Sequence, residues 1–180
     1  MSRPVNLVLS CLLLAFVAAA CSKPASNSTA ETLNSPAPSS SEQKITSESV
    51  VKAAAQRLEI PAGGSGVATV QLTIKSGYHV NANPPTYPYL KATALDILPG
   101  DGVSVAFVTY PKAIEKKFVF AEKPLAVYEG TADLNATLKT DKSVRKGERS
   151  VPARLRIQAC DDQVCYPPGT IELAILVNIN

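Results

Sequence analysis

The sequence predicts an all-β fold, an immunoglobulin-like antiparallel β-sandwich that spans residues 46–180. Three observations lead to this prediction. Apolar and polar residues alternate with a period of two along several short segments, as in half-buried strands. Clusters rich in Gly, Pro, Asp and Asn separate these segments. No long segment has the spacing of an amphipathic helix, and strands at this density are typical of a sandwich whose two sheets enclose one core.

The predicted strands fall into two groups. The clearest alternation lies in the segments 66–77, 102–111, 131–140, 151–160 and 170–180. Shorter or less regular candidates are 50–60, 78–82, 92–98 and 125–128. In the segment 102–111, alternation predicts that Val103, Val105 and Phe107 face the core.

The segment from Pro111 to Pro124 is the least strand-like part of the domain. Its sequence, PKAIEKKFVFAEKP, mixes charged residues with Phe118 and Phe120. We expect a long loop here, and long loops inside compact domains are often functional.

The first twenty residues resemble a secretory signal peptide. Arg3 precedes an apolar stretch, Leu7 to Ala20, which is shorter than the ~20 apolar residues that span a membrane comfortably. Small residues lead directly to Cys21 and resemble a bacterial lipobox. We therefore expect cleavage after residue 20 and lipid attachment at Cys21; the alternative is an ordinary signal peptide followed by a chance cysteine.

Residues 21–45 are predicted to form a disordered linker. Ser, Pro, Ala, Thr and Asn dominate the stretch from Ser22 to Ser41, which cannot bury enough apolar surface to become ordered. A lipid at Cys21 would attach the domain to a membrane. Ser22 after that cysteine favours the bacterial outer membrane, on the periplasmic side.

Composition excludes several classes of function. The formal charge is +3 and no run of Lys or Arg forms a nucleic-acid patch, so we expect no nucleic-acid partner. His79 is the single histidine, which makes a multi-histidine metal site impossible. No phosphate-binding loop or catalytic triad is recognisable, so we expect neither a metal nor a cofactor.

Two cysteines remain for chemistry in the folded part. Cys11 lies in the predicted signal peptide and Cys21 is the predicted lipid site, which leaves Cys160 and Cys165. Continued alternation through the segment 151–160 puts Cys160 on the polar face with Arg154 and Arg156. That position predicts an accessible sulfur at the end of a strand.

The spacing of this pair allows a structural or a redox role. A disulfide that closes so short a loop gains only about 2 kcal/mol in the chain-entropy model, which is little for a structural bond. Accessible and locally closed disulfides are the labile ones that suit thiol–disulfide exchange. From spacing alone, the two roles remain equally open.

The segment that contains the pair resembles a known family. CDDQVCYPPGTIEL, residues 160–173, is similar to the end of the N-terminal periplasmic domain of the thiol:disulfide interchange protein DsbD. Upstream, VQLTIKSGYHVNAN and YPKAIEKKFVFAEKPLAVYEG resemble other parts of the same domain. The likeness extends from about Val50 to Asn180.

This resemblance implies an immunoglobulin-like carrier of reducing equivalents. Cys160 and Cys165 would be its redox pair, with Cys165, beside Tyr166-Pro167-Pro168, bonded to partners. In the family, a membrane-embedded domain reduces the pair, and the pair then reduces periplasmic thioredoxin-like proteins. For this chain we expect a separate membrane electron donor related to that domain.

The resemblance also implies an aromatic loop that shields the cysteines. Phe118 or Phe120 could supply it, and the alternative is that both pack into the core. Tyr166 and His79 could tune the site, although a lone strand histidine is more often a surface residue.

Together these observations predict an exported, lipid-anchored carrier of the protein-disulfide reductase type. The alternative function is a non-catalytic binding or assembly module with the same fold and a permanent disulfide.

Overall fold

The computed structural model describes residues 44–180. The expected signal peptide, the lipid site at Cys21 and most of the expected linker lie outside the described residues. Within residues 44–180 the only helix is a short 3-10 turn, η1 (Ser47–Ser49), and none is long and apolar enough to span a membrane.

The rest of the ordered structure is made of strands, which confirms the predicted all-β class. Their bounds are β1 (Val51–Ala55), β2 (Leu58–Ile60), β3 (Ser65–Ile74), β4 (His79–Asn81), β5 (Ala94–Ile97), β6 (Val103–Thr109), β7 (Ile114–Lys116), β8 (Leu125–Tyr128), β9 (Thr131–Thr140), β10 (Gly147–Ile157), β11 (Ala159–Cys160) and β12 (Gly169–Ile179).

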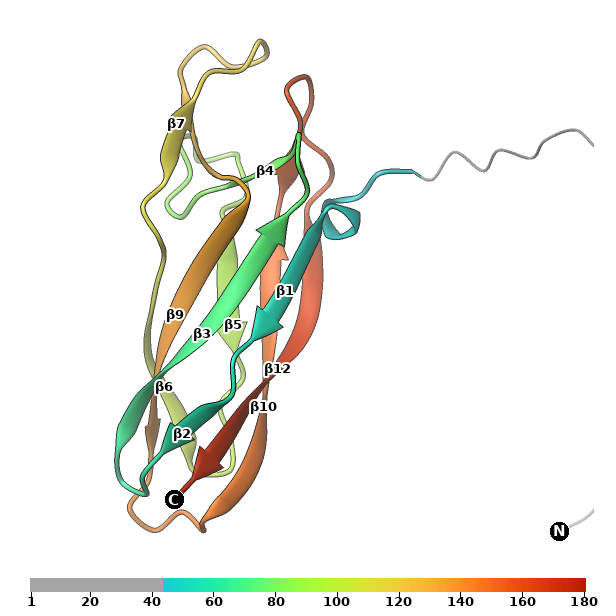
Figure 1. The fold of residues 1–180 in the computed structure, drawn as a ribbon. Coiled ribbons are helices and arrows are strands. Elements are labelled where there is room, and N and C mark those ends of the chain that lie inside the picture. Colours follow the sequence, from blue (N-terminus) through green and yellow to red (C-terminus); the bar gives the residue numbers. More distant parts are fainter. Residues whose placement is uncertain (1–43) are drawn as a thin grey trace, which may run out of the picture. The chain divides into compact units, whose positions relative to one another are not determined.

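Two four-stranded sheets form the sandwich (Figure 1). One has the strand order β1-β3-β9-β6 and is antiparallel throughout. The other has the order β2-β12-β10-β5, in which β2 and β12 run parallel and the other pairs are antiparallel. The immunoglobulin-like sandwich expected from the sequence is therefore the observed fold.

Strand alternation builds the core between the two sheets. In β9, Ala132, Leu134, Ala136 and Leu138 are buried while their neighbours are more exposed, and β10 repeats this pattern. Every second side chain of a strand points to the same face, so one apolar face per sheet is enough to fill the interior.

One inward-facing prediction is wrong. Phe107 was expected in the core, yet its side chain is 57% exposed. The pairing between β6 and β9 shifts register between Val105 and Phe107, so a bulge turns the following residues to the other face. Val108 packs against the core in its place.

A third sheet, in the order β11-β4-β8-β7, lies at one end of the sandwich. Figure 1 shows β4 and β7 at this end, beside the loop that follows β10 and leads into β12. The segment 111–124 was expected to be a loop throughout, but it contributes β7 to this sheet. The strand order therefore brings that segment to the same end as the two cysteines.

Two leucines of the same sheet test the predicted core. Leu155 in β10 is fully buried, whereas Leu176 in β12 is 36% exposed. We expect Leu155→Ala to lower the free energy of unfolding by about 2–5 kcal/mol, because it removes buried methyl groups and leaves a cavity. Leu176→Ala should cost less than about 1 kcal/mol. Urea denaturation of both variants measures the difference, and equal losses would contradict the assignment of the core.

Candidate functional site

Cys160 and Cys165 form a disulfide at the end of the sandwich that carries the third sheet. Their Cα atoms are 3.9 Å apart, and the two residues face each other as an isolated antiparallel bridge. Cys160 also pairs with His79 of β4 on its other side. The residues Cys165, Cys160 and His79 therefore form one row across three neighbouring chain segments.

The predicted exposure of Cys160 is wrong. The residue is fully buried, whereas Cys165 is partly exposed. The prediction extended the alternation of β10 through Gln158, but β10 ends at Ile157. From Ala159 the chain pairs with β4 in the third sheet, and both residues of β11 are buried there. The more accessible residue of the pair is consequently Cys165.

The loop between the cysteines is shaped by one carboxylate. Oδ1 of Asp161 accepts hydrogen bonds from the backbone N–H groups of Gln163 and Val164, each at 2.8 Å. Oδ2 accepts a hydrogen bond of 2.5 Å from the hydroxyl of Tyr166. This last bond is the main cause of a lowered pKa of Asp161, and it raises the pKa of Tyr166 to about 12. The carboxylate therefore stays charged and the phenol stays protonated at neutral pH.

Side-chain hydrogen bonds also fasten the base of the loop. The amide of Gln158 accepts hydrogen bonds from Nδ2 of Asn81 at 3.1 Å and from the backbone N–H of Lys91 at 3.0 Å. Its Nε2 donates to the carbonyl of Tyr166 at 3.3 Å. Gln158 thus joins the cysteine loop to β4 and to the segment that follows it.

A buried serine also forms hydrogen bonds to the cysteine loop. The hydroxyl of Ser47 in η1 donates to the carbonyl of Pro167 at 2.6 Å and accepts from the backbone N–H of Ala159 at 3.0 Å. Ser47 is fully buried, so both contacts are made out of water. The first turn of the domain is therefore attached to both sides of the cysteine loop.

His79 is fully buried, so the alternative of a surface position is wrong. Neither ring nitrogen has a hydrogen-bond partner among residues 44–180. Burial is the main cause that lowers the pKa of His79 to about 4; the Lys116 charge adds to it, while the carboxylates of Glu129, Asp162 and Asp161 oppose it. The imidazole is therefore neutral at pH 7, with one N–H donor and one acceptor nitrogen.

The two phenylalanines of the predicted shielding loop occupy different environments. Phe118 is buried and stacks on the ring of His79, with centroids 4.1 Å apart. Phe120 is 42% exposed and stacks on Phe118 at 5.3 Å. Phe118 thus packs in a small apolar cluster with Leu125 and Val127, separate from the sandwich core.

A charged side chain lies next to this stack. Nζ of Lys116 is 2.6 Å from Glu129 and 3.4 Å from Asp162, and it lies 5.4 Å from the ring centroid of Phe118. The hydrogen bond to Glu129 is the largest cause of a raised pKa of Lys116. The bond to Asp162 connects the cysteine loop with the segment that carries the phenylalanines.

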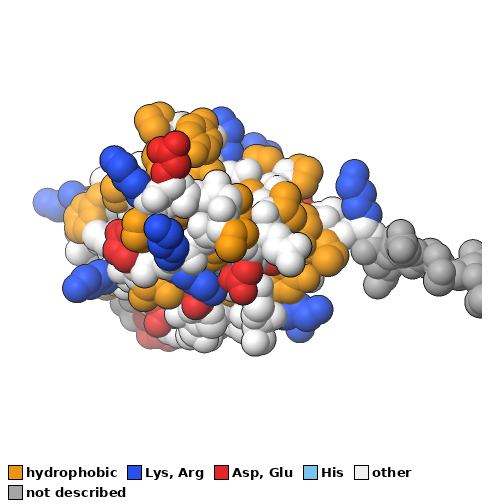
Figure 2. Space-filling model, turned by 90° about the horizontal axis from the view of Figure 1, so that it is seen from above, with side chains coloured by type: hydrophobic (Ala, Val, Ile, Leu, Met, Phe, Trp, Pro, Cys, Tyr) orange, Lys and Arg blue, Asp and Glu red, His pale blue; other side chains and the backbone are white. Residues whose placement is uncertain are grey.

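A groove of about 370 Å³ opens beside Cys165. Three exposed apolar side chains, Tyr89, Phe120 and Val164, take part in its lining. Figure 2 looks onto this end of the domain, where apolar side chains are interspersed with charged ones. The partly exposed residue Cys165 therefore lies at the edge of a surface that could receive an apolar part of another protein.

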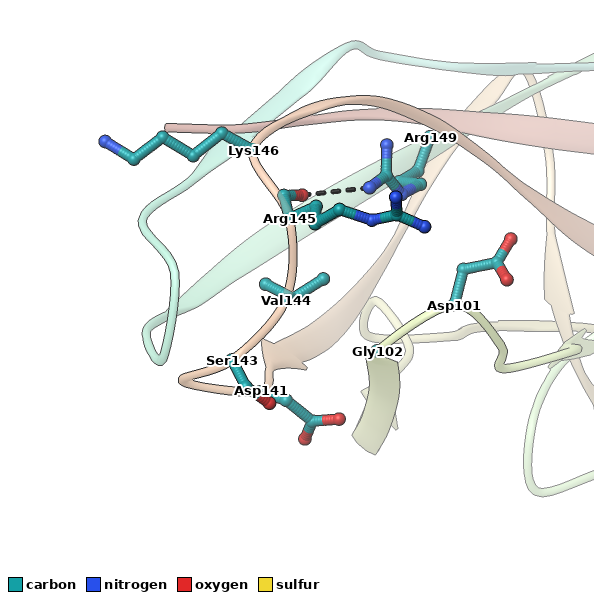
Figure 3. A pocket seen from close by; sticks show the side chains of 8 residues that line it. All are labelled: Asp101, Gly102, Asp141, Ser143, Val144, Arg145, Lys146 and Arg149. Carbon is teal, nitrogen blue, oxygen red and sulfur yellow. Dashed lines mark hydrogen bonds between the residues drawn. The ribbon is translucent and has the colours of Figure 1, made fainter.

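A larger hollow, of about 760 Å³, lies at the turn between β9 and β10, at the opposite end of β10 from the cysteines (Figure 3). Charges of both signs line it, including Asp101, Arg145 and Arg149, and Arg149 donates a hydrogen bond to the carbonyl of Arg145. No cysteine or histidine reaches it. Within residues 44–180, no cluster of His, Cys, Asp and Glu side chains could hold a metal ion.

The structure thus brings together Cys160, Cys165, His79, Phe118, Phe120 and Tyr166, all of which were expected at the site. The sequence reasoning missed Ser47, Asn81, Gln158 and Lys116. The contacts of these four residues depend on which distant segments pair, so no local sequence pattern predicts them. The turn at Asp161 differs, because an Asp two residues before the N–H that it binds is a local signature of a turn closed by an Asp side chain.

Comparison with known proteins identifies a family for this sequence. The sequence matches the family described as "Thiol:disulfide interchange protein DsbD, N-terminal" over residues 46–176. No curated protein matches significantly.

Two solved structures are similar to this chain. One is the N-terminal periplasmic domain of ScsB from Proteus mirabilis, with 14% identity over 70% of this chain and 46% of that one, and a TM-score of 0.51, which supports the fold. The other is the N-terminal domain of DsbD from Neisseria meningitidis in the reduced form, with 20% identity over 73% of this chain and 87% of that one, and a TM-score of 0.46. On the strength of the family match, which extends over nearly the whole described domain, this chain belongs to the family of DsbD N-terminal domains.

Proposed function

We propose that this domain carries reducing equivalents by exchanging its Cys160–Cys165 disulfide with thiols of partner proteins. The observation that carries the proposal is the unequal burial of one bonded pair. Cys165 is partly exposed and lines an apolar groove, whereas Cys160 is fully buried and does not line it. Exchange needs one approachable sulfur and one leaving sulfur, and this pair supplies both.

Cys165 is the cysteine that bonds to partners in this proposal. An attacking thiolate must approach along the S–S bond, and only the Cys165 side is open to the groove. The attack would form a mixed disulfide at Cys165 and release Cys160 inside the domain. In the opposite direction, when Cys165 of the dithiol attacks a partner disulfide, Cys160 would act as the resolving thiol, because it remains next to the new bond.

As a purely structural link, this disulfide would add little to the stability of the domain. The loop it closes is already held at its base, where Ile157 pairs with Gly169 and the N–H of Tyr166 donates to the carbonyl of Ala159 at 2.8 Å. A further link over so few residues adds only about 2 kcal/mol in the chain-entropy model.

Membership of the family supports the choice of partners. We propose that a membrane electron donor related to the DsbD transmembrane domain reduces the pair, and that the dithiol then reduces thioredoxin-like proteins of the periplasm. The similar domain of ScsB from Proteus mirabilis is periplasmic, which supports export of this chain as well. Such a chain would be a carrier of the protein-disulfide reductase type.

Single-cysteine variants test the exchange. We expect Cys160→Ser, whose resolving thiol is gone, to accumulate a mixed disulfide with a thioredoxin-like protein that lacks its resolving cysteine and whose remaining cysteine carries a thionitrobenzoate group, because the Cys165 thiolate attacks that disulfide and displaces thionitrobenzoate as the leaving thiolate. Cys165→Ser is the matched control. Its remaining thiol is buried, so we expect its reaction to be at least about tenfold slower. Non-reducing electrophoresis and mass spectrometry measure both.

Two results would contradict the carrier function. One is that neither variant forms a mixed disulfide. The other is a reduction potential of the wild-type pair well below about −300 mV, which marks a resistant structural bond. In that case the domain would be the binding or assembly module that the sequence left as the alternative.

We also propose that the segment 117–121 caps the site. Phe118 anchors it on His79, and Phe120 lines the groove beside Cys165, where it would narrow the approach to the disulfide. Phe120→Ala should therefore speed reduction of the disulfide by dithiothreitol several-fold, because it removes a side chain that narrows the approach to Cys165. Phe107→Ala is the control, since Phe107 is also exposed but lies on β6 of the sandwich. Equal rates for wild type and Phe120→Ala, measured in stopped flow, would rule out the cap.

We propose in addition that Cys21 carries the lipid anchor. We expect the full-length chain, expressed in a Gram-negative host, to partition into the detergent phase of Triton X-114. After proteolytic digestion, mass spectrometry should detect an N-terminal peptide that carries acyl chains at Cys21. Cys21→Ala should move the protein to the aqueous phase. Partition of the variant into the detergent phase would argue against lipid attachment at this residue.

A further inference from the structure

His79 combines features that ordinary packing does not explain. It is a fully buried polar ring whose two nitrogens have no hydrogen-bond partner among residues 44–180. A buried polar group without a partner is costly, so such a group calls for a reason. Stacking on Phe118 satisfies the faces of the ring but not its nitrogens.

The strand register places this ring beside the disulfide. His79 lies directly opposite Cys160 in the antiparallel pair of β4 and β11, and Cys165 lies opposite Cys160 on the other side. Residues that face each other in an antiparallel pair point to the same side of the sheet, with Cβ atoms about 4.5–5.5 Å apart. The register therefore puts the side chains of His79 and Cys160 next to each other, and both residues are fully buried.

The disulfide form of the cysteine pair gives His79 almost no opportunity for a hydrogen bond. A disulfide sulfur has no proton to donate and is at best a weak acceptor. Opening the bond changes this, because Cys160 becomes a thiolate or a thiol. A thiolate accepts a hydrogen bond from the imidazole N–H, and a thiol can donate one to the other nitrogen.

We propose that His79 is the hydrogen-bond partner of the Cys160 sulfur whenever the disulfide is open, both in the mixed disulfide with a partner and in the dithiol. This role deepens the exchange function proposed above and rests on it. His79 is in this sense a positioning residue, since the thiol of Cys160 performs the chemistry.

The exchange can be written with its electrons and protons balanced. A partner thiolate bonds to Sγ of Cys165, the Cys165–Cys160 bond breaks, and Cys160 leaves with the electron pair as a thiolate, which His79 receives as a hydrogen-bond donor. The second thiolate of the partner then attacks the mixed disulfide and releases Cys165. The partner dithiol is oxidised by two electrons, and the two cysteines take up the two protons that the partner thiols lost to solvent.

The surroundings of the ring favour a neutral imidazole that hydrogen-bonds to the Cys160 sulfur over a charged imidazolium that forms an ion pair with it. Lys116 of β7, Glu129 after β8, and Asp161 and Asp162 of the cysteine loop all act on His79. Burial outweighs these charges and holds the pKa of His79 to about 4. Across the neutral range the ring keeps one donor and one acceptor, so it can serve both the thiolate and the thiol.

Two substitutions separate this role from packing. His79→Phe keeps an aromatic ring against Phe118 but has no nitrogen, whereas His79→Gln keeps a donor and an acceptor. In His79→Phe we expect the equilibrium constant for reduction by glutathione to fall about tenfold, which is about 30 mV for a two-electron couple. His79→Gln should recover part of this loss. Val80→Ala, the matched packing control on the same strand, should stay within about twofold of wild type.

A spectroscopic readout uses the fact that the sequence contains a single histidine. In a tag-free domain, ¹⁵N resonances of the imidazole belong to His79 alone. We expect reduction of the disulfide to shift these resonances and to select one tautomer, because one nitrogen gains a partner. The wild-type protein suffices for this measurement, so it stands even if His79→Phe does not fold.

The outcomes are distinguishable from those for the exchange function. Imidazole resonances that do not move on reduction, or a glutathione constant of His79→Phe within about twofold of wild type, would overturn the role of His79 while the exchange function stood. If the wild-type disulfide does not equilibrate with glutathione at all, the exchange function fails. The resonances can then still be compared after reduction with a phosphine, which tests His79 separately.

Discussion

The antiparallel ladder between β10 and β12 is the constraint on which the site depends. It runs from Gly147 opposite Ile179 to Ile157 opposite Gly169. The segment between Ile157 and Gly169 must therefore leave the sheet after β10 and return to it at β12, at one end of the sandwich. Because backbone hydrogen bonds close this excursion, the disulfide within it is not needed to hold the strands together. Opening a bond in this position leaves the strands paired, which meets one requirement of the proposed exchange.

The sequence was sufficient to predict the sandwich because its core strands are covered on one face only. Ala132, Leu134, Ala136 and Leu138 alternate with polar residues, and the structure buries them. The same rule failed at two places where strand pairing changes. A bulge exposes Phe107, and the transfer of the chain from β10 to β11 buries Cys160. Neither event has a local signature, since each depends on which distant strand lies alongside.

Part of the site could be found from sequence because its chemistry is local. The cysteine pair, the turn-forming Asp161 and Tyr166 lie within one short segment, and their residue types indicate their roles. The burial of His79 could not be found in this way. Its environment is made by Phe118, by Cys160 and by the charges around Lys116, which come from three separate parts of the chain. A three-residue strand is too short to show by periodicity which of its side chains are enclosed.

The two hydrogen bonds of Ser47 have a mechanical consequence. They attach the first turn of the described domain to the carbonyl of Pro167 and to the N–H of Ala159, on either side of the cysteine pair. Any pull exerted through the residues ahead of Ser47 is therefore applied to the cysteine loop before it reaches the sandwich. The described domain therefore begins beside the cysteine loop, and its first residues share the end of the sandwich that bears the disulfide.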